Sequence, residues 1–290
     1  MTLVLSALAY FSLMMTFVTF WVKRTIWLWG SFLLIAILLA LYVKILAPAA
    51  LLPIAALGLC HFLLHHHVKS RARIALVLVA IVLSIALAMH FFPGFHNWEI
   101  AHQLILGQGA LPYNFWINFD KPFVGIFLLA WALPLLKTKE EAKKVAKISI
   151  PLALAGIFLI LGLSLYFGVV RFDLKFLPLF LLFPFVNLFL VVIPEEAFFR
   201  GFVQEEIYQS LLKCWPKLSG VGAVFLTALF FTLMHIFWVN SLPFLTLVFV
   251  AGCIYGAIYQ YTKAIESSIL CHFLVNIIHL VFFTYPALGK

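Results

Sequence analysis

Long apolar stretches alternate with short polar connections along almost the whole chain. Most of them approach the length of about 20 residues that a helix needs to cross a bilayer. The stretches lie at residues 2–22, 26–43, 48–65, 74–92, 122–136, 149–170, 176–193, 221–239, 243–261 and 266–285. They are continuously apolar, whereas the strands of a membrane barrel would alternate apolar and polar positions. The pattern therefore predicts an all-α, polytopic transmembrane helix bundle with about eight to ten spans.

The composition excludes most other classes of protein. Hydrophobic residues make up 66% of the 290 residues and charged residues only 10%, whereas a soluble domain is about 45–50% apolar and about 25% charged. A soluble fold could not cover so much apolar surface with so few polar side chains. The four cysteines form no Cys-x-x-Cys pair, so neither a zinc ribbon nor a redox pair is indicated.

The formal charge of +9 indicates membrane topology, and no nucleic-acid partner is expected. Most lysines and arginines lie in every second connection, which is typical of loops that face the cytoplasm. These clusters are Lys23 and Arg24; Lys69, Arg71 and Arg73; Lys137, Lys139, Lys143, Lys144 and Lys147; and Lys213, Lys217 and Lys263. Four further basic residues, Lys44, Lys121, Arg171 and Lys175, lie near helix ends, where their charges can reach the membrane interface.

The longest segment that is not apolar is 93–121, which contains several glycines and prolines. Its aromatic residues Trp98, Tyr113 and Trp116 are of the kind found at membrane interfaces. We expect it to be an extracytoplasmic loop. It divides the chain into an N-terminal accessory part, residues 1–121, and a core of membrane helices, residues 122–290.

Two acidic residues stand apart from the other eight, which fall in connections or at span ends. Glu195 and Glu196 follow the largely apolar run 180–193 and precede Ala197. Burying a carboxylate at membrane depth costs several kcal/mol unless it is paired or hydrated, so such residues suggest a functional site. The alternative is that the span ends at Pro194 and that both glutamates lie in water.

Polar residues of three other kinds accompany this pair. Arg200 lies four residues after Glu196, which allows the two to pair on one helix face. His235 is expected deep in a span, between Leu226 and Trp238. His272 and Asn276 are four residues apart in the last span and share a face. A carboxylate and an imidazole can together deprotonate a water molecule, and two N–H donors can stabilise the oxyanion that its attack on a carbonyl creates.

The predicted depths of these residues differ. At about 1.5 Å per residue, Glu195 and His272 fall towards the cytoplasmic side and His235 falls nearer the other side. A tilted or late-starting helix, or a bend at Pro194, would reconcile them. Gly252 and Gly256 show the small-x-x-x-small spacing that allows two helices to approach closely, which by itself indicates packing only.

Together these residues resemble the CAAX protease and bacteriocin-processing (Abi) family of intramembrane proteases, which is related to the type II CAAX prenyl endopeptidases. Four motifs occur in the family's order, within about residues 176–285. They are Glu195-Glu196-Ala197-Phe198-Phe199-Arg200, then Phe231 to His235, then Phe249 to Gly252 with Gly256, and finally His272 to Asn276. Each motif alone is weak, but four in order on separate apolar stretches are specific.

The resemblance implies a role for each matched residue. Glu195 and His235 would activate the water, His272 and Asn276 would form the oxyanion site, and Glu196 and Arg200 would support them. Helix packing near the site would involve Phe231, Phe249, Gly252 and Gly256. The implied substrate is a membrane-associated or lipidated protein or peptide, and the implied location is the cytoplasmic (inner) membrane of a prokaryote.

No cofactor is expected. Zinc bound by Glu195, His235 and His272 is an alternative, but the sequence has no His-Glu-x-x-His motif and Asn276 suits an oxyanion better than a metal. Two other functions stay open. One is a scaffold or immunity protein that binds a peptide without cleaving it. The other is a proton-coupled transporter, since glutamate and histidine within the membrane also mark proton pathways; the absence of an evident repeat argues against it.

Overall fold

A computed structural model describes residues 2–66, 71–176, 178–237 and 241–289. It divides into two compact units. Unit 1 comprises Met1–Glu99, Trp116–Leu135 and Phe189–Phe198, and unit 2 comprises Ile100–Phe115, Leu136–Leu188 and Phe199–Lys290. Predictions for Lys69, and for the parts of two spans at residues 177 and 238–239, lie outside the described residues.

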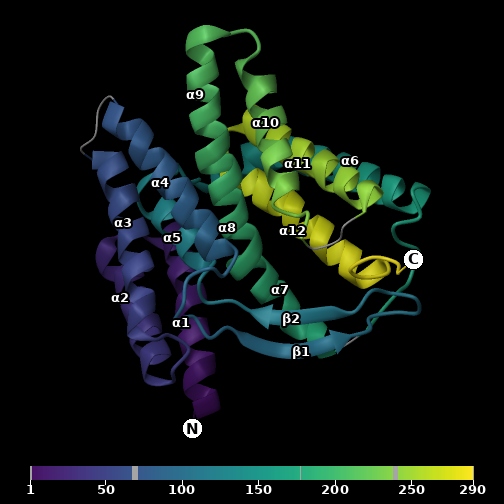
Figure 1. Ribbon diagram of the computed structural model, residues 1–290. Coiled ribbons are helices and arrows are strands. Elements are labelled where there is room, and N and C mark those ends of the chain that lie inside the picture. The colour runs from purple at the N-terminus through teal and green to yellow at the C-terminus, as the bar shows by residue number, and fades with distance from the viewer. Residues whose placement is uncertain (1, 67–70, 177, 238–240, 290) are drawn as a thin grey trace. The chain divides into compact units, whose positions relative to one another are not determined.

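Unit 1 is built from pairs of neighbouring helices around one short buried helix. Helix α1 packs on α2, α3 packs on α4, and α5 contacts α1, α3, α4 and α8 (Figure 1). The bounds are Thr2–Val22 for α1, Ile26–Tyr42 for α2, Leu51–His66 for α3, Arg71–Ala88 for α4, Pro122–Trp131 for α5 and Ile193–Glu196 for α8; a 3-10 turn, η1, at Pro48–Ala50 precedes α3. Every residue of α5 from Pro122 to Ala130 is buried, so α5 forms the core of this unit.

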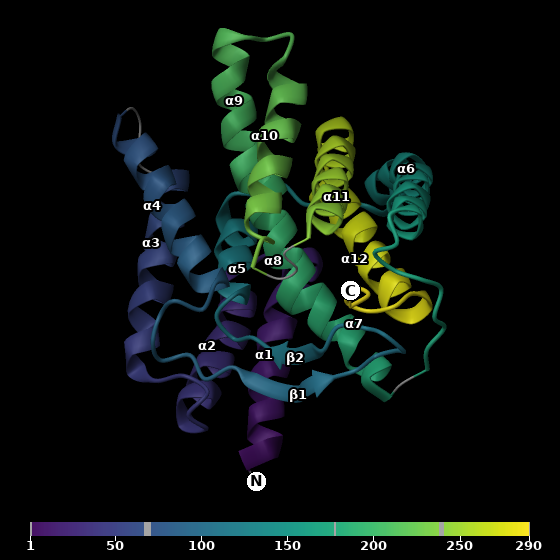
Figure 2. The same ribbon diagram turned by 45° about the vertical axis from the view of Figure 1, so that its right-hand side comes forward.

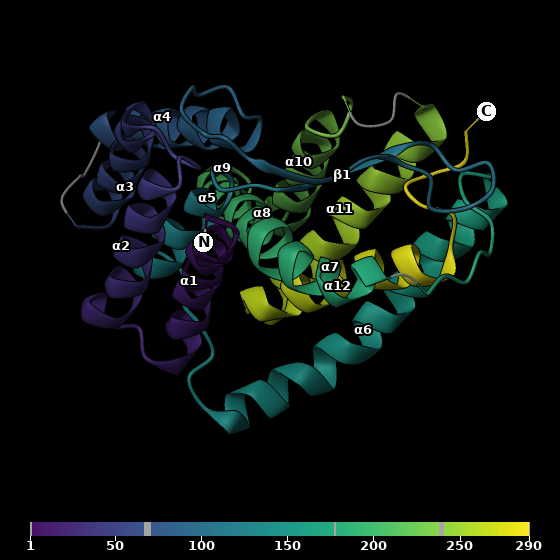
Figure 3. The ribbon, with the colours of Figure 1, turned by 90° about the horizontal axis from the view of Figure 1, so that it is seen from below.

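Unit 2 contains a second bundle of helices. Its members are α6 (Lys139–Tyr166), α9 (Glu205–Cys214), α10 (Ser219–Leu233), α11 (Leu242–Thr262) and α12 (Ile265–Phe282). Helices α9 and α10 lie side by side (Figure 2), and α10 also packs on α11. Helix α6 runs along α12 (Figure 3) and also contacts α11. The hydrophobic core of unit 2 includes Ile157 and Ile160 of α6, Tyr255 of α11 and Cys271 of α12.

The chain is helical throughout residues 183–214, so no helix ends at Pro194. A 3-10 turn, η2 (Pro178–Leu181), precedes this segment, which begins with the short helix α7 (Phe183–Val186). Two π-helical stretches then flank α8, namely η3 (Asn187–Val192) before it and η4 (Ala197–Gln204) after it. Proline removes one backbone donor and crowds the carbonyl four residues earlier. In a π-helix, hydrogen bonds join backbone groups that are five residues apart rather than four, and such turns occur frequently at functional sites. Glu195 and Glu196 therefore lie within a helix.

The segment predicted as a loop contains a β-hairpin, which corrects that prediction. Strands β1 (Trp98–Leu104) and β2 (Tyr113–Ile117) pair in a two-stranded sheet. In β2, Phe115 and Ile117 are buried, whereas Asn114 and Trp116, which alternate with them, are exposed. This alternation with a period of two is the signal of a half-buried strand, and it was hidden by the surrounding glycines.

Several helix boundaries differ from those predicted. Helix α6 begins at Lys139 rather than at residue 149, so the predicted lysine-rich loop is partly helical. Its start is set by a capping box, in which the backbone N–H of Glu141 donates to the hydroxyl of Thr138 at 3.1 Å and the Glu141 side chain binds back. Helix α5 ends at Trp131 rather than at residue 136, and α10 ends at Leu233 rather than at residue 239.

The prediction of an all-α membrane bundle is confirmed. Within the described residues, five helices are long and apolar enough to cross a membrane, and they lie at Thr2–Val22, Pro48–His66, Lys139–Tyr166, Leu242–Thr262 and Ile265–Phe282. Four shorter apolar helices lie at Ile26–Tyr42, Ala72–Ala88, Pro122–Trp131 and Ser219–Leu233. The chain is thus an integral, multi-pass membrane protein. The predicted total of eight to ten crossings, and a functional division at residue 121, stay predictions.

Candidate active site

Glu195 lies in α8 of unit 1 and forms an ion pair with Lys121 of the same unit. The Nζ atom of Lys121 donates to Oε1 of Glu195. The two side chains are 14% and 12% exposed, respectively. The lysine is the residue just before α5, and 74 residues separate it from its partner. Sequence reasoning placed Lys121 at a membrane interface and missed this pair.

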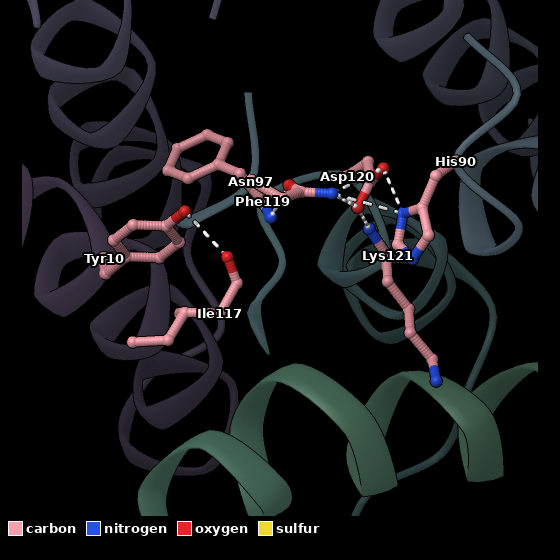
Figure 4. Close-up of polar contacts among 7 residues, drawn as sticks. All are labelled: Tyr10, His90, Asn97, Ile117, Phe119, Asp120 and Lys121. Atoms are coloured by element: carbon pink, nitrogen blue, oxygen red, sulfur yellow. Dashed lines mark hydrogen bonds and ion pairs between the residues drawn. The ribbon is translucent and has the colours of Figure 1, made fainter. Parts of the chain in front are cut away.

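Lys121 is positioned by a buried carboxylate next to it (Figure 4). Asp120 is 1% exposed, and its Oδ1 atom accepts the backbone N–H of Lys121 at 2.9 Å. Its Oδ2 atom lies 2.6 Å from Nδ1 of His90 and 3.2 Å from the amide nitrogen of Asn97. Asn97 in turn accepts the backbone N–H of Phe119 at 2.8 Å. The backbone at the start of α5 is therefore held on both sides of Asp120.

A glycine one turn along α5 brings that helix close to α8. A Cβ atom added to Gly125 would lie 2.8 Å from Cα of Pro194, a distance that side chains do not reach without displacement of the backbone. Gly125 is four residues after Lys121 and so shares its helix face. The same face of α5 therefore packs on Pro194 and provides the cation for Glu195.

In unit 2, Arg200 of η4 is fully buried among aromatic rings. Its guanidinium carbon lies 4.7 Å from the centre of the Phe231 ring and 5.3 Å from that of Tyr255. Its Nη2 atom donates to the carbonyl of Gly252 at 3.2 Å. Cation–π contacts of this kind gain strength when the cation is removed from water, so the rings help to stabilise the buried charge.

The two predicted histidines gather around the same rings. The ring centres of His235 and Phe231 are 4.4 Å apart. His272 stacks on Tyr255 with a centroid distance of 4.7 Å and an interplanar angle of 16°, and it meets Phe231 edge-on at 6.1 Å. Arg200, His235 and His272 thus all lie against Phe231, and Arg200 and His272 also lie against Tyr255. Sequence reasoning did not single out Tyr255, whose only signal is its place between two packing glycines.

His235 does not lie deep in a helix, which corrects the prediction. Helix α10 ends at Leu233, and His235 lies in the turn that follows. Its Nδ1 atom is 2.8 Å from the carbonyl oxygen of Phe231. A carbonyl only accepts hydrogen bonds, so Nδ1 carries a proton, and in the neutral ring the lone pair is then on Nε2. This tautomer suits a general base.

Asn276 lies one turn after His272 on α12, as the spacing predicted. Its side-chain amide donates to Oδ1 of Asn187 at 3.4 Å, and Asn187 is 6% exposed. Asn187 was not singled out from the sequence, because a lone asparagine in an apolar run carries no specific signal. Its contact orients the Asn276 amide on α12.

The predicted packing residues make close helix contacts in unit 2. A Cβ atom on Gly252 would lie 3.1 Å from Cα of Ala228, so α10 and α11 approach closely there. A Cβ atom on Gly256 would lie 2.8 Å from Oε1 of Gln204, whose amide donates to the Gly256 carbonyl at 3.0 Å. Phe249 packs edge-on against Phe225 of α10, at 5.5 Å.

The predicted site residues fall in both units. Glu195 and the fully buried Glu196 belong to unit 1, whereas Arg200, His235, His272 and Asn276 belong to unit 2. The pairing of Glu196 with Arg200 stays a prediction, because it assumed α-helical turns and the residues from Ala197 onwards are π-helical. Among the residues that the structure describes, no group of three His, Cys, Asp or Glu side chains is arranged to hold a metal ion. Independence from metals also stays a prediction.

Comparison with known families gives one match. Residues 175–278 match the model of a family described as type II CAAX prenyl endopeptidase Rce1-like. This range contains all four motifs, from Glu195 to Asn276. The resemblance inferred from those motifs is therefore confirmed. Comparison with curated proteins and with solved structures found no match.

Proposed function

We propose that the protein is an intramembrane endopeptidase, because residues 175–278 match the model of the Rce1-like family of type II CAAX prenyl endopeptidases. Its substrate is a membrane-associated or lipidated protein or peptide. The family is a protease family, and the observation that carries the proposal is that the matched range includes every motif residue. The clustering of Arg200, His235 and His272 around Phe231 supports it.

In the proposed reaction, Glu195 and His235 share one water molecule. As the water oxygen attacks the carbonyl carbon of the scissile bond, a C–O bond forms and an O–H bond of the water breaks. The proton passes to the Glu195 carboxylate or to Nε2 of His235. It then moves to the nitrogen of the scissile bond as the C–N bond breaks. One water is consumed, and the products are a carboxylic acid and an amine.

The oxyanion formed by this attack needs donors that are already in place. We assign this role to His272 and Asn276, which lie one turn apart on α12. The stacking of His272 on Tyr255 and the contact of Asn276 with Asn187 hold both side chains in one orientation. Glu196 and Arg200 support the arrangement, and no metal takes part.

The test is cleavage of a farnesylated CAAX peptide by the purified protein in lipid, followed by mass spectrometry. We expect Glu195→Gln to reduce kcat at least a hundredfold, because general-base catalysis contributes about 10²–10⁴-fold. Glu140→Gln is the matched control, since Glu140 is an exposed glutamate of α6, and it should leave kcat unchanged. A folded Glu195→Gln protein that cleaves as well as wild type would show that the assignment is wrong.

Two further arms address the alternatives. If a chelator abolishes cleavage and added zinc restores it, the metal-free mechanism is wrong. If the farnesylated peptide is not cut, comparative proteomics of membrane fractions from cells with wild-type protein and with Glu195→Gln will identify the true substrate. Full cellular function of the Glu195→Gln protein would instead favour a peptide-binding or immunity role.

A further inference from the structure

We propose that Lys121 is a positioning residue for Glu195, which keeps the carboxylate ionised and oriented for proton transfer. The inference depends on the proposed role of Glu195 as a base. Lys121 lies outside residues 175–278 that match the family, so it is not one of the motif residues. The segment just before α5 therefore contributes a residue to the active site.

The first argument is the contact itself. The ammonium of Lys121 and the carboxylate of Glu195 form an ion pair within unit 1. Both side chains are largely withdrawn from solvent, where the attraction between opposite charges is much stronger than in water. A nearby cation favours the ionised form of a carboxyl group, and only the ionised form can accept a proton from water.

The second argument is that Glu195 needs such a cation. Glu196 follows it directly and is fully buried, and an adjacent carboxylate disfavours the ionised form of Glu195. Among the described residues of unit 1, the charged groups near the pair include Asp120, and His90 lies against Asp120. Asp120 accepts hydrogen bonds from Lys121, His90 and Asn97. It is thus engaged by its own donors, while the Lys121 ammonium extends away from it towards the helix that carries Glu195 (Figure 4).

The third argument is preorganisation. A lysine side chain is flexible, so a lysine that acts on one specific group needs a fixed starting point. The backbone N–H of Lys121 is held by Asp120, and the close approach of Gly125 to Pro194 holds α5 against α8 one turn away. The Lys121 ammonium therefore contacts Glu195 from the start of α5, where the backbone is held in place.

The experiment compares wild type, Lys121→Met and Lys121→Arg by the pH dependence of kcat for the farnesylated CAAX peptide. Removing the charge makes it easier for Glu195 to take up a proton. The acidic limb of the profile should therefore move to higher pH, by about one to three units for a neighbouring charge. On that limb kcat falls about tenfold per unit while KM stays unchanged. Lys121→Arg keeps the charge and should keep the limb near its wild-type position.

Lys263→Met is the matched control. Lys263 also pairs with a glutamate, since its Nζ atom lies 3.9 Å from Oε2 of Glu205, but its side chain is 47% exposed. This variant should leave both kcat and the acidic limb unchanged. A limb that stays in place in Lys121→Met would overturn the proposal, whatever happens to kcat, and so would an equal shift in Lys263→Met.

A second measurement uses only the wild-type and Glu195→Gln proteins, so it does not require the Lys121→Met protein to fold. Infrared difference spectra between wild type and Glu195→Gln isolate the carboxyl band of Glu195. We expect the ionised band at pH 7, and a protonated band at that pH would contradict the proposal. The failures are distinguishable: an active Glu195→Gln protein refutes the proposed function, whereas an inactive one with an unmoved limb in Lys121→Met refutes this inference alone.

Discussion

Glu195 in unit 1 and His272 in unit 2 are surrounded by different kinds of side chain. Glu195 meets an ammonium group, that of Lys121, whereas His272 lies against the rings of Tyr255 and Phe231. An ion pair acts on the charge of a group, because it favours one protonation state over the other. Ring stacking acts mainly on orientation. In the proposed mechanism, the charge of Lys121 thus acts on the protonation state of the proposed base Glu195, and ring stacking orients the proposed oxyanion donor His272.

Among the further variants that bear on this comparison, the largest expected effect tests its aromatic side. His272→Gln removes the proposed oxyanion donor, and the loss of one such donor costs about 10²–10³-fold in kcat. We expect this fall in kcat with little change in KM, measured with the farnesylated peptide. His279→Gln is the control, because His279 lies on the same helix and contacts the carbonyl of Thr284. If both variants lose activity equally, His272 has no special role.

The next effect tests the charged side through packing. Gly125→Ala places a methyl group 2.8 Å from Cα of Pro194, and overpacking of this kind costs about 1–3 kcal/mol. We expect a lower free energy of unfolding in denaturant titrations. We also expect reduced kcat, because α8 must move away from the face that carries Lys121.

Gly162→Ala is the control for this change. Apart from the backbone of its own helix and its chain neighbours, no atom of the described residues lies within 4 Å of a Cβ at Gly162, and alanine is favoured over glycine in a helix by about 1 kcal/mol. This variant should be as stable as wild type or more so. A Gly125→Ala protein with wild-type stability would show that the close approach of α5 and α8 is not required.

The smallest effect separates the ring of Tyr255 from its hydroxyl group. Tyr255→Leu removes the stacking on His272, and aromatic pairs contribute about 0.5–1.5 kcal/mol beyond the area that they bury. We expect the free energy of unfolding to fall by at least that amount and kcat to fall modestly. Tyr255→Phe keeps the ring and should retain most of both. Equal losses in the two variants would assign the effect to the hydroxyl group instead.

Local patterns predicted the C-terminal helices well. Helix α11 was expected at 243–261 and lies at Leu242–Thr262, and α12 was expected at 266–285 and lies at Ile265–Phe282. Continuous apolar runs mark such helices, and the spacing of His272 and Asn276 followed from helical geometry. The start of α6 differs from the prediction, because its first turns are charged and lie outside the apolar run.

The sequence by itself determined the membrane class, the order of the four motifs and the isolation of the Glu195–Glu196 pair, because each is a property of neighbouring residues. Only the tertiary structure decided that Lys121 pairs with Glu195, which is 74 residues away in the sequence. It also decided that Arg200 and two histidines lie against the rings of Phe231 and Tyr255, and that residues 98–117 contain a hairpin. The physical reason is that an ion pair or a ring stack depends on distance in space. A single chain pattern carries no record of which distant helices pack together.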